Sequence, residues 1–315
     1  MIRLKKNIFI LILAINSFIF SKNLGYIIKD DIIVYREEIE GAKKEYELPF
    51  INKESFEIIN DIYARDNISA FYKGKRINFS DSKTFTVLSQ NIAKDKYRIF
   101  YNGEILSNNL NTKDIELVNK YYIKDKYYYY GINEYKSKDY SVYGKNFNNK
   151  NLAKITNRIK INSDMKIQDE YLISKENIYY LGKKIDNIDL NTFQNLKYGI
   201  SKDKDNIYFN GINIKFLNGI ELKDKDLKNV GENYFRNKNN IYIVTDSDID
   251  NEFWIYKLNL SSDLLDFKVI SKDYFINNGI GYYKTDQIGK IDEKTFKIIR
   301  DKYSKDKNNI YFENK

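Results

Sequence analysis

The sequence predicts an all-β fold made of one short unit repeated along the chain. Two phrases recur: Lys-Asp-Lys followed closely by Ile-Tyr-Phe, at 202–209 and 305–312, and Asp-x-Lys-Thr-Phe, at 81–85 and 292–296. The 315 residues include 29 Tyr and 19 Phe, and aromatic residues favour the pleated surface of a sheet. Self-similarity of this kind is typical of repeat architectures.

The interval between the two phrases is the strongest evidence for the repeat. A fixed interval marks the packed part of a unit, because one added residue would turn every strand side chain to the wrong face. The distance from one copy to the next varies, as expected for loops. About eight copies follow the N-terminus, within residues 22–315. In seven cases the apolar anchor precedes an Asp or Asn by ten residues: Phe56–Asp66, Phe85–Asp95, Ile115–Asp125, Phe193–Asp203, Leu227–Asn237, Phe267–Asn277 and Phe296–Asp306.

Each unit is predicted to contain three short strands. The first carries the anchor, for example over 84–88, the second runs up to the Lys-Asp pair, and the third is the Ile-Tyr-Phe segment. Asn and Asp tolerate positive φ and form hydrogen bonds with their own backbone, so Lys-Asp-Lys-Asn-Asn is interpreted as a turn. Asn102-Gly103 and Asn210-Gly211 are interpreted as second tight turns. An alternative gives the anchor phrase one helical turn, because Phe85 and Leu88 are three residues apart.

Two irregular inserts interrupt the repeat, near 136–166 and 244–266. The first is rich in Asn and Lys. It is consistent with a longer loop, a hinge between two half-arrays or a degenerate unit around 138–143, and we expect the degenerate unit.

The N-terminus is typical of a secretory signal peptide, predicted over 1–21. Arg3, Lys5 and Lys6 precede a 13-residue apolar stretch, 8–20, which is too short to span a bilayer comfortably. An uncleaved N-terminal anchor is the alternative. Cleavage near Ser21 would leave no stable transmembrane segment, and we expect an extracytoplasmic protein.

Composition excludes several chemistries. The chain has no Cys and no His, so disulfides, Cys nucleophiles, Ser-His-Asp triads and His/Cys zinc sites are closed to it. The formal net charge of +9 falls to +6 without the three basic residues of the signal. These charges alternate as Lys-Asp neighbours, whereas nucleic-acid binding requires clustered Lys and Arg. We therefore expect no nucleic-acid partner and no enzyme activity.

The two phrases together resemble the DKNYY family of bacterial repeat proteins. The resemblance covers roughly residues 50–315 apart from the inserts, and it implies an exported or envelope location without supplying catalytic residues. The chain departs from the pattern where Glu176, Asn237 and Asn277 replace the Asp. A chemical role would tolerate Asn poorly, so these departures indicate that the Asp is structural.

The insert 244–266 carries a candidate calcium site. Asp246, Asp248 and Asp250 alternate as in loop Ca²⁺ sites, although Lys257 stands where a bidentate Glu would be expected. A solvated acidic loop is the alternative. No other cofactor is predicted.

The same insert carries a candidate ligand-binding surface. Trp254, the only Trp, and Tyr256 could stack on a glycan or an envelope protein, since inserts in repeat arrays often lie on the binding face. The alternative is that the tyrosines cover the sheets and display their hydroxyls.

The sequence thus predicts an open or superhelical meander of β units, with a closed propeller as the alternative. Units of about 30 residues fall short of the roughly 40 per propeller blade. The expected function is non-enzymatic: an exported envelope or cell-surface repeat protein that binds or scaffolds through variable loops. The alternative is a carbohydrate-active enzyme that uses paired carboxylates.

Overall fold

A computed structural model describes most of the chain after residue 23. The described residues are 24–29, 32–39, 42–48, 50–138, 149–214, 216–217, 220–221, 226–246, 253–260, 266–300 and 302–313. The predicted signal peptide, 1–21, lies outside them. The chain divides into two compact halves, Met1–Lys160 and Ile161–Lys315, each of which is described by itself.

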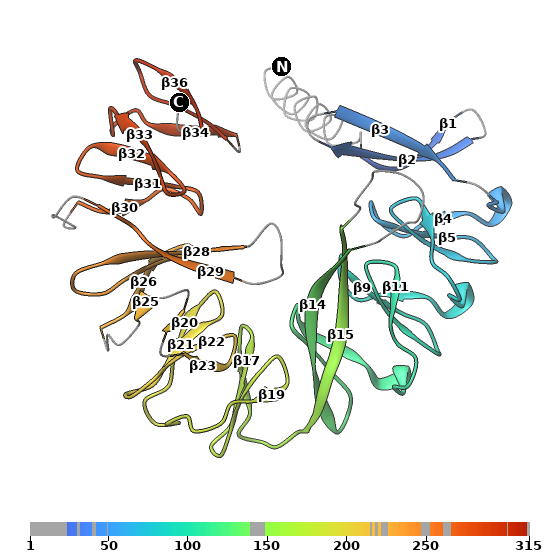
Figure 1. The fold of residues 1–315 in the computed structure, drawn as a ribbon. Coiled ribbons are helices and arrows are strands. Elements are labelled where there is room, and N and C mark those ends of the chain that lie inside the picture. Colours follow the sequence, from blue (N-terminus) through green and yellow to red (C-terminus); the bar gives the residue numbers. More distant parts are fainter. Residues whose placement is uncertain are drawn as a thin grey trace, which may run out of the picture. The chain divides into compact units, whose positions relative to one another are not determined.

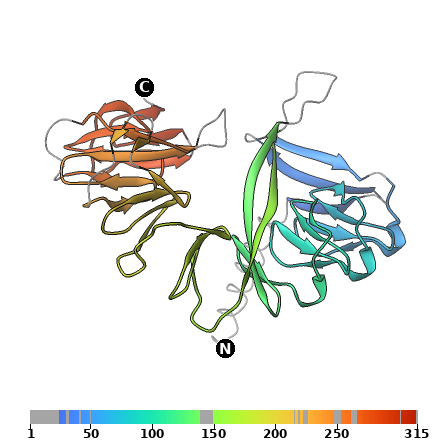
Figure 2. The ribbon, with the colours of Figure 1, turned by 60° about the horizontal axis from the view of Figure 1, so that its bottom comes forward.

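The described residues of the N-terminal half form four antiparallel sheets, which follow one another along the chain (Figures 1 and 2). Three 3-10 turns precede its second, third and fourth sheets: η1 (Lys53–Ser55), η2 (Ser82–Thr84) and η3 (Thr112–Asp114). The strands are β1 (Gly25–Lys29), β2 (Ile32–Ile39), β3 (Ala42–Glu47); β4 (Glu57–Ile58), β5 (Tyr63–Arg65), β6 (Ala70–Tyr72), β7 (Lys75–Arg76); β8 (Thr86–Val87), β9 (Ile92–Lys94), β10 (Ile99–Tyr101), β11 (Glu104–Ser107); β12 (Glu116–Asn119), β13 (Tyr122–Lys124), β14 (Tyr128–Lys138) and β15 (Asn149–Lys160).

The described residues of the C-terminal half form five sheets of three or four strands and one small hairpin. The strands are β16 (Lys166–Gln168), β17 (Tyr171–Ile173), β18 (Ile178–Tyr180), β19 (Lys183–Lys184); β20 (Gln194–Lys197), β21 (Ile200–Lys202), β22 (Ile207–Phe209), β23 (Ile212–Ile214); β24 (Phe216–Leu217), β25 (Ile220–Glu221); β26 (Lys228–Gly231), β27 (Tyr234–Arg236), β28 (Ile241–Asp246), β29 (Phe253–Lys257); β30 (Lys268–Val269), β31 (Tyr274–Asn277), β32 (Ile280–Tyr283), β33 (Asp286–Lys290); β34 (Lys297–Arg300), β35 (Tyr303–Lys305) and β36 (Ile310–Phe312).

The predicted all-β repeat is confirmed, but most units have four strands rather than three. Within every sheet each strand pairs with the next one in sequence, and seven sheets contain four strands. The added strand follows the Asn-Gly turn. Asn102 and Gly103 both have positive φ, 50° and 79°, as a two-residue hairpin turn requires, and the chain then returns as β11. The order is a simple meander.

The anchor phrase combines both predicted conformations. In the sheet β8–β11, Asp81 caps the 3-10 turn η2, Phe85 ends it, and only Thr86 and Val87 are in strand β8. The strand predicted over 84–88 is therefore shorter, because its first residue belongs to the turn.

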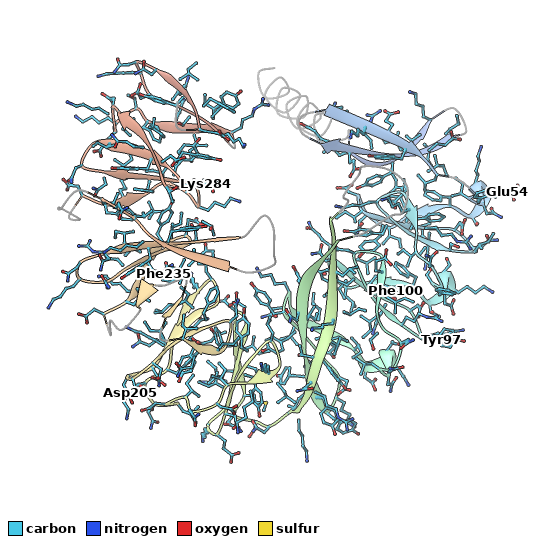
Figure 3. The ribbon with its side chains drawn as sticks, in the orientation of Figure 1. Glu54, Tyr97, Phe100, Asp205, Phe235 and Lys284 are labelled. Atoms are coloured by element: carbon cyan, nitrogen blue, oxygen red, sulfur yellow. The ribbon has the colours of Figure 1, made fainter. Side chains whose placement is uncertain are left out.

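Within each half the core lies between successive sheets, and an anchor side chain, such as Phe85 or Ile115, forms part of each described interface. Phe85 packs with ring centroids 5.9 Å from Tyr63 of the preceding sheet and 5.9 Å from Phe100 of its own sheet. These three side chains are at least 96% buried, and Figure 3 shows Phe100 inside the stack of sheets. Each sheet thus buries its apolar face on its neighbour, as expected of a repeat array.

The two inserts extend existing units. Strands β14 and β15 pair from Tyr128↔Lys160 to Lys138↔Asn149, so the described part of 136–166 includes the arms of one long hairpin. The degenerate unit expected around 138–143 lies outside the described residues except for Lys138, which ends strand β14, so it stays a prediction. The insert 244–266 contains a similar hairpin, β28–β29, paired up to Asp246↔Phe253.

Candidate functional site

The turn that contains the Lys-Asp-Lys phrase is held together by its Asp. Asp203, which is buried, accepts hydrogen bonds at Oδ1 from the backbone N–H groups of Asp205 (2.8 Å) and Asn206 (2.7 Å). Its Oδ2 accepts the N–H of Asp189 at 2.9 Å and the hydroxyl of Tyr208 at 2.8 Å. One carboxylate therefore joins the turn, the third strand and the start of the anchor phrase.

This geometry accounts for the ten-residue interval. The N–H that reaches Oδ2 lies 14 residues before the Asp, and the anchor follows that N–H by four residues. The same bond from a residue 14 positions earlier recurs in three further sheets: Asn52 to Asp66, Asp81 to Asp95 and Asp292 to Asp306, all at 2.8–2.9 Å. An inserted residue would break this bond as well as the strand register.

The Lys and Thr of the two phrases form a second connection. The Lys204 ammonium pairs with Asp189 at 2.9 Å, and the Lys204 N–H donates to Thr192 Oγ1 at 3.0 Å. The equivalent ion pairs are Lys96–Asp81 and Lys307–Asp292, and the equivalent acceptors are Thr84 and Thr295. The polar residues of the repeat are thus used to hold each unit together.

Substitutions at the Asp position follow the same logic. Asn237 still accepts two N–H groups at Oδ1, but its Nδ2 donates to the Tyr242 hydroxyl, which reverses the direction seen at Asp203. The match of Glu176 to the Asp is wrong: Ser174 Oγ accepts the N–H groups of Glu176 and Asn177, so Ser174 occupies the Asp position. Asn277 pairs directly with Ile280 across Asn278 and Gly279, which have φ of 50° and 74°, so a two-residue turn of the same length but another type replaces the phrase there.

The lowered pKa values of these carboxyl groups keep them ionised, as a permanent hydrogen-bond acceptor requires. Three backbone N–H groups and the Tyr311 hydroxyl lower the pKa of Asp306 to about 2, with the bond from Asp292 contributing most. Burial alone would raise the pKa of Asp203, but its hydrogen bonds outweigh that effect and lower it. A carboxyl held ionised in this way is poorly suited to donate a proton.

The predicted sites in the insert are only partly described. Asp246 ends strand β28, whereas Asp248 and Asp250 lie outside the described residues, so the calcium site stays a prediction. Trp254 and Tyr256 both belong to β29, and the Tyr256 side chain is 43% exposed. Within the described part of the chain, no group of three acidic residues gathers as metal ligands do.

Two surface clefts were not predicted from the sequence. One, of about 280 Å³, lies in the N-terminal half and is lined by Asn78, Phe79, Tyr101, Gly103, Glu104, Ile105, Leu152 and Ala153. The other, of about 350 Å³, is lined by residues 239–241 and 257–260 of the C-terminal half. The first cleft is lined by strands from different sheets, and its lining residues do not recur from unit to unit. Neither of the two repeated phrases therefore predicts it.

The fold and the turn chemistry define a class: a β-repeat protein whose recurring polar residues are scaffold. The family model of the DKNYY family matches residues 3–104 and 171–315, and the chain belongs to this family. The unmatched stretch, 105–170, contains the long β14–β15 hairpin. Neither the comparison with curated proteins nor that with solved structures found a match. None of the described segments is a helix with the length and apolar character needed to cross a bilayer.

Proposed function

We propose that the protein is exported and acts without catalysis, binding or scaffolding in the cell envelope through the positions at which its repeats differ. The proposal is supported by a difference between two sets of residues within each unit: those shared between copies and those that vary. The shared Asp, Lys, Thr and Tyr are engaged in holding the turn, as at Asp203, Lys204 and Thr192. The residues free to differ between copies lie in exposed turns and extended hairpins.

Export is tested by the fate of the N-terminus. The full-length chain is expressed in a bacterial host, the cells are fractionated, and the mass of the product is measured. The expected product is extracytoplasmic and lacks the first 20 or so residues. Replacing Arg3, Lys5 and Lys6 by Glu is the control and should abolish processing. A full-length product in the cytosol would overturn the proposed location.

Binding is tested with washed cell envelopes. Purified protein should sediment with the envelopes in a saturable manner, and release of reducing sugar ends from envelope polysaccharide should stay at background. Turnover of polysaccharide would favour the rival class, a glycoside hydrolase that uses two carboxylates. Absence of saturable binding would contradict the proposed binding role.

A further inference from the structure

Two positions of the repeat carry exposed apolar side chains in more than one unit of the N-terminal half. The first is two residues after the turn Asp: Ile68, Tyr97 and Tyr127 follow Asp66, Asp95 and Asp125, and are 55–60% exposed. The second is two residues before the residue that caps the 3-10 turn: Phe50 is 93% and Phe79 is 75% exposed, whereas Asn109 stands at this position before η3. Large apolar side chains this exposed, and recurring in register, are unusual on a soluble surface.

The C-terminal half has polar residues or, at Gly279, no side chain at the same positions. Glu176, Asp205, Asn239 and Asn308 stand two residues after the turn acceptor, and all are exposed. Asn187 and Lys290 stand where Phe50 and Phe79 do. Figure 3 shows Tyr97 and Asp205 each at the outer tip of its turn. The turn itself therefore does not require an aromatic residue, and the aromatic residues distinguish one half of the protein.

The backbone conformation at Phe50 and Phe79 disfavours a bulky residue, so the stability of the fold does not explain why phenylalanine is present there. Phe50 and Phe79 have φ of 57° and 60°, and Asn187 at the matching position has 57°. Asn tolerates this left-handed region, whereas a bulky residue there is an outlier. An exposed ring in a strained backbone position gains little from packing. Outliers of this kind point to function.

Cations lie against these rings. The Lys96 ammonium is 4.6 Å from the centroid of the Tyr97 ring, and the Lys126 ammonium is 5.4 Å from that of Tyr127. The Arg98 guanidinium lies 6.0 Å from the Tyr97 ring and 5.8 Å from the Phe79 ring, and it donates to the Phe79 carbonyl at 2.9 Å. Arg98 thus joins the two repeat positions into one surface.

The anchor turns of the N-terminal half also have fewer capping carboxylates than those of the C-terminal half. Asp189 and Asp292 cap the anchor turns of the C-terminal half and pair with Lys204 and Lys307. In the N-terminal half, two of the three capping residues are amides, Asn52 and Asn111. Lys126 therefore has a neutral residue at the position that supplies a carboxylate to Lys204.

We propose that Phe79, Tyr97, Arg98 and Tyr127 form a binding surface for a linear acidic polysaccharide. This deepens the proposed binding function and rests on it for the choice of an envelope polymer. The rings stack on the apolar faces of sugars, and the cations pair with their carboxylates. A polymer is favoured because the rings repeat from sheet to sheet, about 10 Å apart where sheets pack face to face. Phe79 also borders the 280 Å³ cleft, which extends the surface to Ile105 and Leu152.

The test uses purified protein and polygalacturonic acid, a linear polyuronate, with binding followed by calorimetry. Dextran, anionic phospholipid vesicles and a single-stranded oligonucleotide are the comparison probes. We expect binding to the polyuronate that weakens with salt, and no comparable binding to the other three. Tyr97→Ser and Phe79→Asn should each weaken it about tenfold, as truncation of an interface anchor does.

Two controls keep the result interpretable. Tyr303→Ser removes an exposed tyrosine from the C-terminal half and should leave the affinity unchanged. Phe79→Asn places at φ 60° the residue found at Asn187, so its melting temperature should equal or exceed that of the wild type. Loss of binding without loss of stability is not expected of a structural residue.

The other possible outcomes would contradict the proposed binding surface. Binding that is unaffected by Tyr97→Ser and Phe79→Asn, or lost with Tyr303→Ser, would place the site elsewhere and leave the proposed binding function intact. Preference for vesicles or for the oligonucleotide would replace the polysaccharide by that partner. Absence of polyuronate binding overturns the inference, whereas only the envelope sedimentation experiment decides the proposed function.

Discussion

Asp203, like Asp306, accepts bonds from three parts of its unit at once, and its replacement should be costly. In Asp203→Asn, the Oδ1 bonds to Asp205 and Asn206 can persist, as they do at Asn237, but Nδ2 cannot accept the Asp189 N–H. We expect a loss of about 2 kcal/mol in the free energy of unfolding, because a buried N–H is left without an acceptor. Urea denaturation measures it.

Asp205→Asn is the matched control, since Asp205 lies exposed in the same turn. Its effect should stay within about 0.5 kcal/mol, as for other surface substitutions. Equal losses in the two variants would show that the turn Asp does not have the role that its hydrogen bonds assign to it.

Stability should also fall in acid as these carboxylates are protonated. The pKa of Asp306 is about 2 when folded, against an ordinary value of 3.8. A depressed folded pKa stabilises the protein above the unfolded value, and this contribution is lost as the pH falls from about 4 toward 2. Urea midpoints measured across this range should drop more steeply for the wild type than for Asp306→Asn. Parallel curves would contradict the linkage.

At the scale of residues, sequence reasoning recognised the structural Asp but not its partners. Three substitutions suggested that chemistry was not its role, and the hydrogen bonds agree. The bond from Asp189 to Asp203 could not be predicted, because it depends on how the anchor turn folds back. Glu176 was misassigned because Ser174 forms the same turn with a shorter side chain.

At the scale of elements, the Asn210-Gly211 turn packs closely on the preceding sheet, which leaves no room for a side chain at its glycine. Gly211 has φ 74°, and a Cβ built on it would lie 2.7 Å from the Tyr180 Cβ. Gly211→Ala should therefore lower the free energy of unfolding by about 3 kcal/mol, since backbone strain and overpacking add. Thermal denaturation followed by circular dichroism measures it.

Gly279→Ala separates these two effects. Gly279 has the same φ of 74°, but the nearest atom to its added Cβ is the flexible Glu293 Oε1, at 3.7 Å. The strain remains and the crowding does not, so we expect about 1 kcal/mol. If the two variants were equally unstable, packing of the turn on Tyr180 would be unimportant.

The fourth strands show why elements were harder to predict than the repeat. Strands β7 and β19 are two residues long and consist of Lys and Arg, which carry no strand propensity. Charged residues of this kind are typical of edge strands, where they discourage pairing with another chain. The β14–β15 hairpin was missed for a related reason: its second arm is rich in Asn and Lys, and the pairing of the arms depends on residues far apart in sequence.

At the scale of the whole molecule, the fixed interval predicted stacked copies of one unit, and the sheets follow one another in that way. The sequence did not predict how cores would be shared between copies. Seven buried clusters are described, and each joins neighbouring sheets of a single half; one of them includes Ile99, Tyr101, Ile115 and Ile123. Whether the array is an open meander or a closed propeller stays a prediction.

Because these cores are internal to each half, the halves should fold independently. Fragments 22–160 and 161–315 should each unfold cooperatively in calorimetry, with midpoints within about 3 °C of the matching transitions in the full chain, a difference of about 1 kcal/mol. A cut after Ser107 is the control: it separates Ile99 and Tyr101 from Ile115 and Ile123, and should leave the core between β8–β11 and β12–β15 exposed. A single transition in the full chain, absent from both fragments, would mean that folding is cooperative across the boundary at Lys160.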